Sequence, residues 1–150
     1  MLVETIARAI ARAEGFFVAD SLPQRANNPG ALTLGDVGFG TIADKTVFGS
    51  LAAGWEALHR QVALMLSGAS AYYNPQMTLA QVAVIYTGGD NPTGWAQTVA
   101  SALGVTPTTT LAEIGGAGSV EAAPELANLL LLGAAAILFF LSGPAGAAGF

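Results

Sequence analysis

The chain of 150 residues has no cysteine and a single histidine, His59. Without thiols it can form no disulfide framework and no thiolate metal site, and one imidazole is too few for a zinc centre. We therefore expect neither a metal nor another cofactor. His59 is expected on a solvated helix face.

Charged residues are also scarce, at 10% of the chain, with 5 Lys and Arg against 10 Asp and Glu. This balance leaves no basic patch that could neutralise phosphates, so we expect no nucleic-acid partner. The N-terminus does not have the pattern of a secretory signal, because Glu4, Arg8 and Arg12 interrupt any apolar run. No Lys or Arg follows Arg60, so the positive-inside rule cannot orient a later membrane segment.

Apolar residues, by contrast, make up 53% of the chain and are concentrated in its last quarter. Residues 126–150 carry no charge, and residues 129–141 are almost continuously apolar. At 1.5 Å per residue, a helix over 126–141 would span about 24 Å, less than the ~30 Å hydrocarbon core, but adding 145–150 makes it long enough. We interpret this stretch as a single-pass membrane segment. Helix packing in an oligomer is the alternative interpretation.

Near the N-terminus, the apolar residues Leu2, Ile6 and Ile10 recur every four residues, which predicts an amphipathic helix. Glu14 is the next position in this series, and Gly15 is the stop signal. The helix dipole and apolar neighbours both disfavour a charged carboxylate there, so the pKa of Glu14 should be raised. A raised pKa is what a carboxylic acid needs in order to donate a proton near neutral pH.

The segment after this helix predicts a turn and a small ribbon. Asn28-Pro29-Gly30 is a turn signal, because proline fixes φ and glycine accepts a positive φ. Two short strands are predicted at 31–34 and 37–43, joined at Gly35-Asp36. A helix that ends in Glu, followed by a turn and a β-hairpin, resembles the active-site cleft of the lysozyme-like superfamily.

Two motifs make this resemblance closer. Residues 13–17 read A-E-G-F-F and residues 22–32 read L-P-Q-R-A-N-N-P-G-A-L. Together they resemble the E-G-[FY]…R-N-N-N-P-G-N-[LI] signature of phage and prophage lysozyme-like proteins related to lytic transglycosylases. Residues 48–55, F-G-S-L-A-A-G-W, are similar to the family's F-x-S-x-x-x-G-[WY] segment. Ala26 and Ala31 depart from the pattern, since the family often has asparagine at both positions.

The resemblance covers roughly Ile6 to Ile114 and implies an α+β lysozyme-like fold that is mainly helical. Further helices are predicted from their caps: 51–67 after Ser50, one from Thr78 to about Tyr86, 94–103, and a short one after Thr110. We therefore divide the chain into a catalytic domain over 1–114, a flexible linker over 115–125 and the apolar helix over 126–150.

The resemblance implies cleavage of the β-1,4 glycosidic bond between the sugars of peptidoglycan, with Glu14 as general acid. A hydrolase would need a second carboxylate about 5–9.5 Å away, for which Asp36 and Asp44 are the candidates. The lytic-transglycosylase route needs only one glutamate, which acts as acid and then as base while the substrate's own hydroxyl closes an anhydro ring.

The resemblance also implies a set of substrate-binding residues. Gln24, Arg25, Asn27 and Asn28 are expected to shape the cleft floor or its supporting hydrogen bonds. Tyr86 occupies the place of an aromatic-x-x-Gly segment in lytic transglycosylases. There it could stack on a sugar or form a hydrogen bond near the catalytic glutamate, or it could be a core tyrosine at a helix end.

A function of another class stays open. The two alanine departures are also compatible with a structural protein of a virion or membrane that binds glycan without turnover. Either protein is expected in a phage particle or the host cell envelope, with membrane lipid and other virion proteins as further partners.

Overall fold

The computed structural model describes residues 2–118. This part of the chain is mainly helical, with one small antiparallel sheet, and so has the expected α+β composition. The elements are α1 (Leu2–Ala13), α2 (Leu22–Arg25), β1 (Thr41–Ile42), β2 (Lys45–Thr46), α3 (Leu51–Ser67), α4 (Leu79–Tyr86), α5 (Pro92–Leu103) and α6 (Leu111–Gly118).

The C-terminal predictions fall largely beyond this range. The predicted membrane segment, 126–150, lies outside the described residues, as does most of the linker predicted over 115–125. α6 continues through the first residues of that linker, to Gly118. Among residues 2–118, no helix is both long and apolar enough to cross a membrane.

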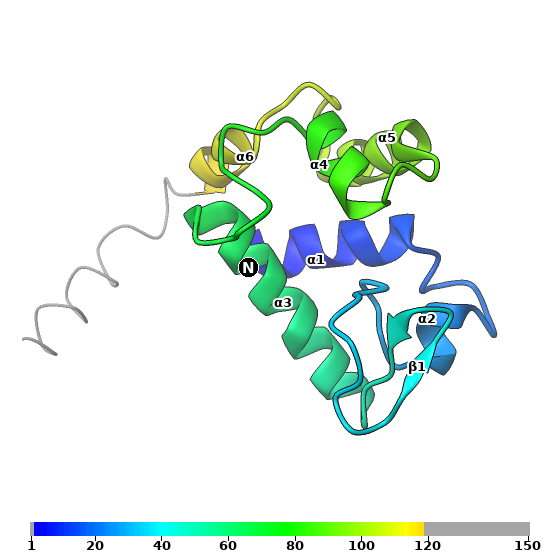
Figure 1. Ribbon diagram of the computed structural model, residues 1–150. Helices are drawn as coiled ribbons and strands as arrows, with labels where there is room; N and C mark the ends of the chain where they lie inside the picture. Colours follow the sequence, from blue (N-terminus) through cyan, green and yellow to red (C-terminus); the bar gives the residue numbers. More distant parts are fainter. Residues whose placement is uncertain (1, 119–150) are drawn as a thin grey trace, which may run out of the picture. The chain divides into compact units, whose positions relative to one another are not determined.

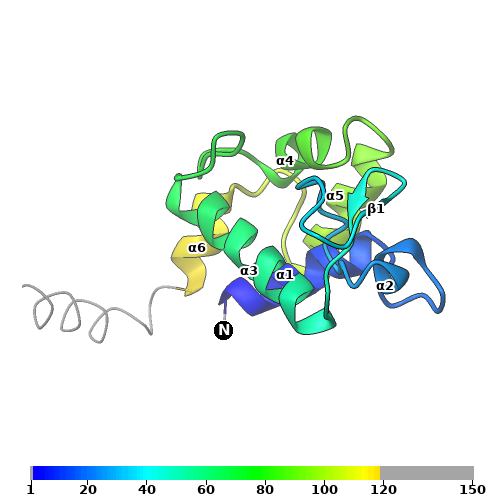
Figure 2. The same cartoon turned by 60° about the horizontal axis from the view of Figure 1, so that its bottom comes forward.

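The first helix is the centre of the folded core. Figure 1 shows α1 between the α4–α5 pair and the segment that carries α2 and the hairpin, and both views place α3 beside α1 (Figure 2). α1 is buried over Ile6, Ala7 and Ala9–Ala11, and its alanines allow neighbouring helices to approach closely. Leu58 and Val62 of α3 and Val99 of α5 are fully buried in the same cluster.

The end of α1 confirms the predicted stop at Gly15. Gly15 adopts φ +76°, and its N–H donates to Arg12 O at 3.1 Å. The N–H of Phe16 donates to Ala11 O at 2.9 Å, which completes a Schellman motif. Glu14 is therefore the last residue before the chain reverses, and its side chain is fixed at the helix end.

The hairpin exists, but the predicted strand positions are wrong. β1 pairs with β2 in the register Thr41↔Thr46 and Ile42↔Lys45, and the turn is Ala43-Asp44 rather than Gly35-Asp36. Both turn residues have left-handed φ values, +47° and +65°, which suit a tight two-residue hairpin.

The physical reason for this difference is the loop around Asp36. Its Oδ1 accepts hydrogen bonds from the N–H groups of Gly38 (2.8 Å) and Gly40 (2.7 Å). These N–H groups are therefore turned inward and cannot form a strand ladder. The predicted first strand instead runs beside β2 as an extended segment, where Thr46 N–H donates to Leu32 O at 3.0 Å.

Local capping signals predicted the remaining helices well. Ser50 Oγ accepts from Ala53 N–H at 3.2 Å at the start of α3, and Gly68, with φ +74°, ends that helix. Thr78 and Gln81 form the predicted capping box of α4. α5 begins at Pro92, two residues earlier than predicted, because Asn91 is its N-cap. The short α2 was not predicted.

Gly54 offers a test of how closely α3 approaches the segment after α2. A Cβ at this position would lie 1.8 Å from Asn27 O, so backbone would have to move. We expect Gly54→Ala to lower the free energy of unfolding by about 3 kcal/mol or more. Gly115→Ala is the matched control, since its Cβ would lie 3.8 Å from Leu66, and it should be neutral or stabilise by up to about 1 kcal/mol. Thermal unfolding followed by circular dichroism compares the two, and equal stabilities would contradict the close contact.

Candidate active site

Glu14 lines a cavity of about 420 Å³ at the C-terminal end of α1. The other walls come from β2, the end of α4, the loop after it and α5. Four residues of these walls carry functional groups suited to chemistry, namely Lys45, Tyr86, Asp90 and Trp95. Residues far apart in the sequence therefore meet around one carboxyl group.

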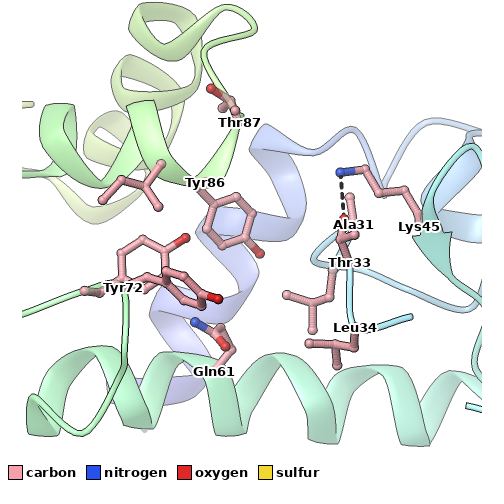
Figure 3. Close-up of a pocket in the computed structure, with 12 residues that line it drawn as sticks. Ala31, Thr33, Leu34, Lys45, Gln61, Tyr72, Tyr86 and Thr87 are labelled. Atoms are coloured by element: carbon pink, nitrogen blue, oxygen red, sulfur yellow. Dashed lines mark hydrogen bonds between the residues drawn. The ribbon is translucent and has the colours of Figure 1, made fainter. Parts of the chain in front are cut away.

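A second cavity of about 390 Å³ adjoins the first, because Lys45, Tyr86 and Thr87 line both. In Figure 3, Tyr86 and Tyr72 lie on one side of it and the extended segment 31–34 lies on the other. The Nζ of Lys45 donates a hydrogen bond to Thr33 Oγ1 at 3.3 Å across the top of that segment. The two cavities together make a cleft between the hairpin side and α4, with Glu14 at one end.

The pKa of Glu14 is raised, as the sequence predicted. Burial of the partly exposed side chain is the largest cause, because it penalises the charged form. A hydrogen bond from Trp95 and the positive charge of Lys45 act in the opposite direction but do not outweigh it. The carboxyl group of Glu14 therefore stays protonated to a higher pH than that of a solvated glutamate.

Trp95 is the most direct partner of Glu14. Its Nε1–H donates to Glu14 Oε1 at 2.7 Å, and its side chain is buried. The sequence predicted the helix over 94–103 that contains Trp95, but no partner for its side chain. The available signal was chemical, since a buried indole N–H usually finds an acceptor. What the sequence could not indicate is that this acceptor lies on α1.

Tyr86 both supports the cleft and lines it. Its hydroxyl donates to Gly30 O at 2.7 Å, and its ring lies 5.0 Å from that of Trp95, centroid to centroid. Burial, and secondarily the charge of Glu14, raises the pKa of Tyr86 well above its ordinary value. The same two causes raise the pKa of Tyr73 to about 12. Both phenols therefore stay neutral beside the acid.

Asn27 and Asn28 hold the wall of the cleft together. Asn28 is fully buried, and its Nδ2 donates to Leu32 O and Thr46 O, each at 2.9 Å, while its Oδ1 accepts from Leu32 N–H at 2.8 Å. Asn27 Nδ2 donates to Phe48 O at 3.1 Å. These bonds make both asparagines supporting residues of the segment before the hairpin.

Gln24 and Arg25 lie elsewhere. Both are exposed on α2, and neither is among the residues that line the two cavities beside Glu14. The structure therefore separates the predicted substrate-binding set into one cleft residue (Tyr86), two supporting residues and two surface residues.

The predicted second carboxylates are not brought to Glu14 either. Asp36 and Asp44 are exposed and line neither cavity. Hydrogen bonds from the backbone N–H groups of Gly40 and Gly38 lower the pKa of Asp36, which is thereby a loop-capping residue. Asp90 lines the same cavity as Glu14, although the sequence did not single it out as a candidate carboxylate.

His59 is half-exposed on α3, and its Nε2 lies 2.5 Å from Glu4 Oε2 on α1. Residues 2–118 hold no group of three or more His, Cys, Asp or Glu side chains placed to bind a metal ion. The groups suited to chemistry that line the two cavities are the carboxyl groups of Glu14 and Asp90, three phenols, an indole and an ammonium group.

Comparison of the chain with protein-family models gives no match, and comparisons with curated proteins and with solved structures give none either. A function for the chain consequently has to be inferred from the residues of this cleft and from the motif resemblance.

The raised pKa of Glu14 predicts how stability depends on pH. Burial penalises the charged form of Glu14 in the folded state only. The free energy of unfolding is therefore unaffected by this penalty below the ordinary pKa of glutamate, and it falls as the pH rises through the raised pKa of Glu14. Glu14→Gln removes this penalty while keeping an acceptor for Trp95. We expect its melting temperature, relative to wild type, to rise between pH 4 and pH 8; about 1 kcal/mol would appear as roughly 4 °C.

Glu113→Gln is the control with the opposite sign. Glu113 Oε2 accepts hydrogen bonds from the N–H (2.7 Å) and the hydroxyl (2.8 Å) of Thr110, which lower its pKa. A lowered pKa contributes stability above the ordinary value and loses it as pH falls. Glu113→Gln should therefore destabilise at pH 8 and have less effect at pH 3. Parallel pH dependences of the two variants would contradict the assignment.

Proposed function

We propose that this chain cleaves the glycan strands of peptidoglycan by acid–base catalysis at Glu14. The observation that carries the proposal is the environment of Glu14, a partly buried carboxyl with a raised pKa at one end of an aromatic-lined cleft. General acids of glycoside cleavage need such an environment, because the leaving oxygen must receive a proton near neutral pH.

In the proposed first step, the proton of Glu14 passes to the glycosidic oxygen as the bond to the anomeric carbon breaks. The developing positive charge on the sugar is stabilised by the Glu14 carboxylate that remains. In the second step, the oxygen of the incoming nucleophile forms a bond to the anomeric carbon, and its proton passes to that carboxylate, which restores the acid. The nucleophile is water in a hydrolase and the substrate's own hydroxyl in a lytic transglycosylase.

The positions of the other carboxylates favour the single-glutamate route. Asp36 accepts hydrogen bonds from N–H groups of its own loop. Neither Asp36 nor Asp44 lines the two cavities of the cleft. Asp90 does share a cavity with Glu14 and is the carboxylate that a two-carboxylate hydrolase would use. Exposed Tyr72 offers a ring face on which a sugar can stack.

The lysozyme-like fold is part of the same proposal. It is supported by a helix that ends in Glu14, a short antiparallel hairpin and a cleft beside both. The signature residues Asn28 and Gly54 serve the architecture in this chain, one by burying its amide in hydrogen bonds and the other by admitting a backbone oxygen. Such roles explain why a signature would require those residue types.

A non-catalytic, glycan-binding structural protein is the second candidate. Ala31 favours it, because this residue adopts φ +46°, a left-handed conformation that asparagine tolerates better than alanine. A chain that has lost asparagine at such a position has less hydrogen bonding at the cleft wall than the resembled family.

Residues 126–150 complete the proposal as a membrane segment. With this segment the protein would be carried in a phage particle or held in the host envelope, where it would meet peptidoglycan during genome delivery or at lysis. Peptidoglycan, membrane lipid and other virion proteins are then its partners.

Glu14→Gln tests the acid. The amide keeps the volume and cannot donate the proton, so we expect clearing of a peptidoglycan gel to fall by about 10²–10⁴-fold.

The matched controls are Asp36→Asn, Asp44→Asn and Asp90→Asn. Full activity of all three, with anhydro muropeptides by mass spectrometry, supports the single-glutamate route. Loss on Asp90→Asn with reducing-end products supports a hydrolase. Near-wild-type clearing by Glu14→Gln with unchanged circular dichroism would rule out the acid, and an inactive wild type that binds glycan would favour the structural protein.

The second test concerns location. We expect the full chain to sediment with membranes or to require detergent, because the run of 25 uncharged residues from 126 to 150 is long enough to span the hydrocarbon core. A chain truncated after Gly118 keeps all the described helices and should remain in the aqueous supernatant after ultracentrifugation. A full chain that stays monomeric in the supernatant would rule out the anchor.

A further inference from the structure

We propose that Trp95 is a positioning residue that fixes which oxygen of the Glu14 carboxyl group carries the catalytic proton. This inference rests on the proposed function of Glu14 as general acid. It adds a role that neither the sequence pattern nor the resemblance assigns to Trp95.

The first step is the direction of the hydrogen bond. Trp95 Nε1–H donates to Glu14 Oε1 at 2.7 Å. An indole nitrogen can donate but has no lone pair with which to accept. Oε1 must therefore act as an acceptor whether the carboxyl group is charged or neutral. In the neutral acid the carbonyl oxygen is a stronger acceptor than the hydroxyl oxygen, so Oε1 is the carbonyl oxygen and the proton is held on Oε2.

The second step is the rigidity of the donor. The Trp95 side chain is only 5% exposed, and its ring packs against Tyr86, whose hydroxyl is itself fixed on Gly30 O. The indole therefore cannot turn its N–H to another acceptor without disturbing both α4 and the segment before the hairpin. This rigidity fixes the plane of the Glu14 carboxyl group as well as the proton's place on it.

The third step concerns the other oxygen. Among residues 2–118, no side chain donates a hydrogen bond to Glu14 Oε2, so its proton is free for a substrate in the cavity. The titratable groups around Glu14 are Lys45 of β2, Tyr73 before α4, Tyr86 of α4 and Asp90 after it. None of them is a donor to Oε2 that would compete with delivery of the proton to a glycosidic oxygen.

The same bond affects the acidity of Glu14. A donor favours the charged carboxylate over the neutral acid, and the Trp95 bond thus opposes the effect of burial on the pKa. Without the bond, the pKa of Glu14 should rise further. The alkaline limb of the activity profile, which reports loss of the catalytic proton, would then move to higher pH.

The hydrogen bond can be observed directly in the unmodified protein. The sequence has 2 tryptophans, so a ¹H–¹⁵N spectrum of the detergent-solubilised full chain contains two indole signals. We expect the Trp95 signal to titrate with Glu14 and to lose this titration in Glu14→Gln. The Trp55 signal, assigned with Trp55→Phe, should not respond to Glu14→Gln. A Trp95 signal that Glu14→Gln leaves unchanged would overturn the proposal.

The functional test replaces Trp95 by 3-benzothienylalanine, which keeps the bicyclic shape and has sulfur in place of the N–H group. We expect kcat on soluble glycan fragments to fall about 10- to 100-fold with little change in KM, and the alkaline limb to move to higher pH. Trp95→Phe should show the same shift if it folds. An isostere with the wild-type profile would overturn the positioning role. The indole titration needs no turnover, so an inactive wild type would refute the proposed function separately from the hydrogen bond.

Discussion

The cleft depends on the buried amide of Asn28 more than on any other polar contact. One side chain satisfies two carbonyl groups and one N–H group, and so joins the turn after α2 to the extended segment and to β2. Because all of these groups are buried, no water is needed to complete the set, and loss of the amide would leave backbone groups without partners. The Gly30 carbonyl that receives the Tyr86 hydroxyl lies two residues further on. The wall of the cleft and Tyr86 are thus fixed by neighbouring hydrogen bonds between side chains and backbone groups.

Signals that act within a few residues predicted the fold well. The caps of α3 and α4 and the glycine that ends α1 each depend on hydrogen bonds over three to five residues, which a sequence displays directly. The predicted strand positions of the hairpin were wrong because the sequence contains two candidate turns. Gly35-Asp36 has the residues that favour a turn, whereas Ala43-Asp44 forms the turn with an alanine in a left-handed conformation. The Asp36 side chain accepts hydrogen bonds from N–H groups of its own loop, and these N–H groups are then not available to a strand at 37–40.

The residues of the candidate site likewise divide into one that local sequence pattern indicated and others that depend on tertiary packing. Glu14 could be predicted because its position relative to α1 follows from helical periodicity alone. The sequence could not connect Trp95 and Asp90 with it, since the hydrogen bond of Trp95 and the place of Asp90 in the same cavity depend on how α5 and the loop before it pack against α1. Under the proposed function, Glu14 also illustrates a common conflict between stability and function, because a carboxyl group in this environment disfavours the folded state whenever it is charged.

The separation of Glu14 and Trp95 along the chain has a consequence for biosynthesis. The two residues stand 81 positions apart, so a ribosome adds Glu14 long before it adds Trp95, the donor of its hydrogen bond. Until α5 is synthesised and packed against α1, Glu14 lacks this hydrogen bond and the part of its cavity that α5 supplies. Under the proposed function, fragments that end before α5 should then have no activity on a cell wall. The proposed activity would appear only once α5 has packed against α1.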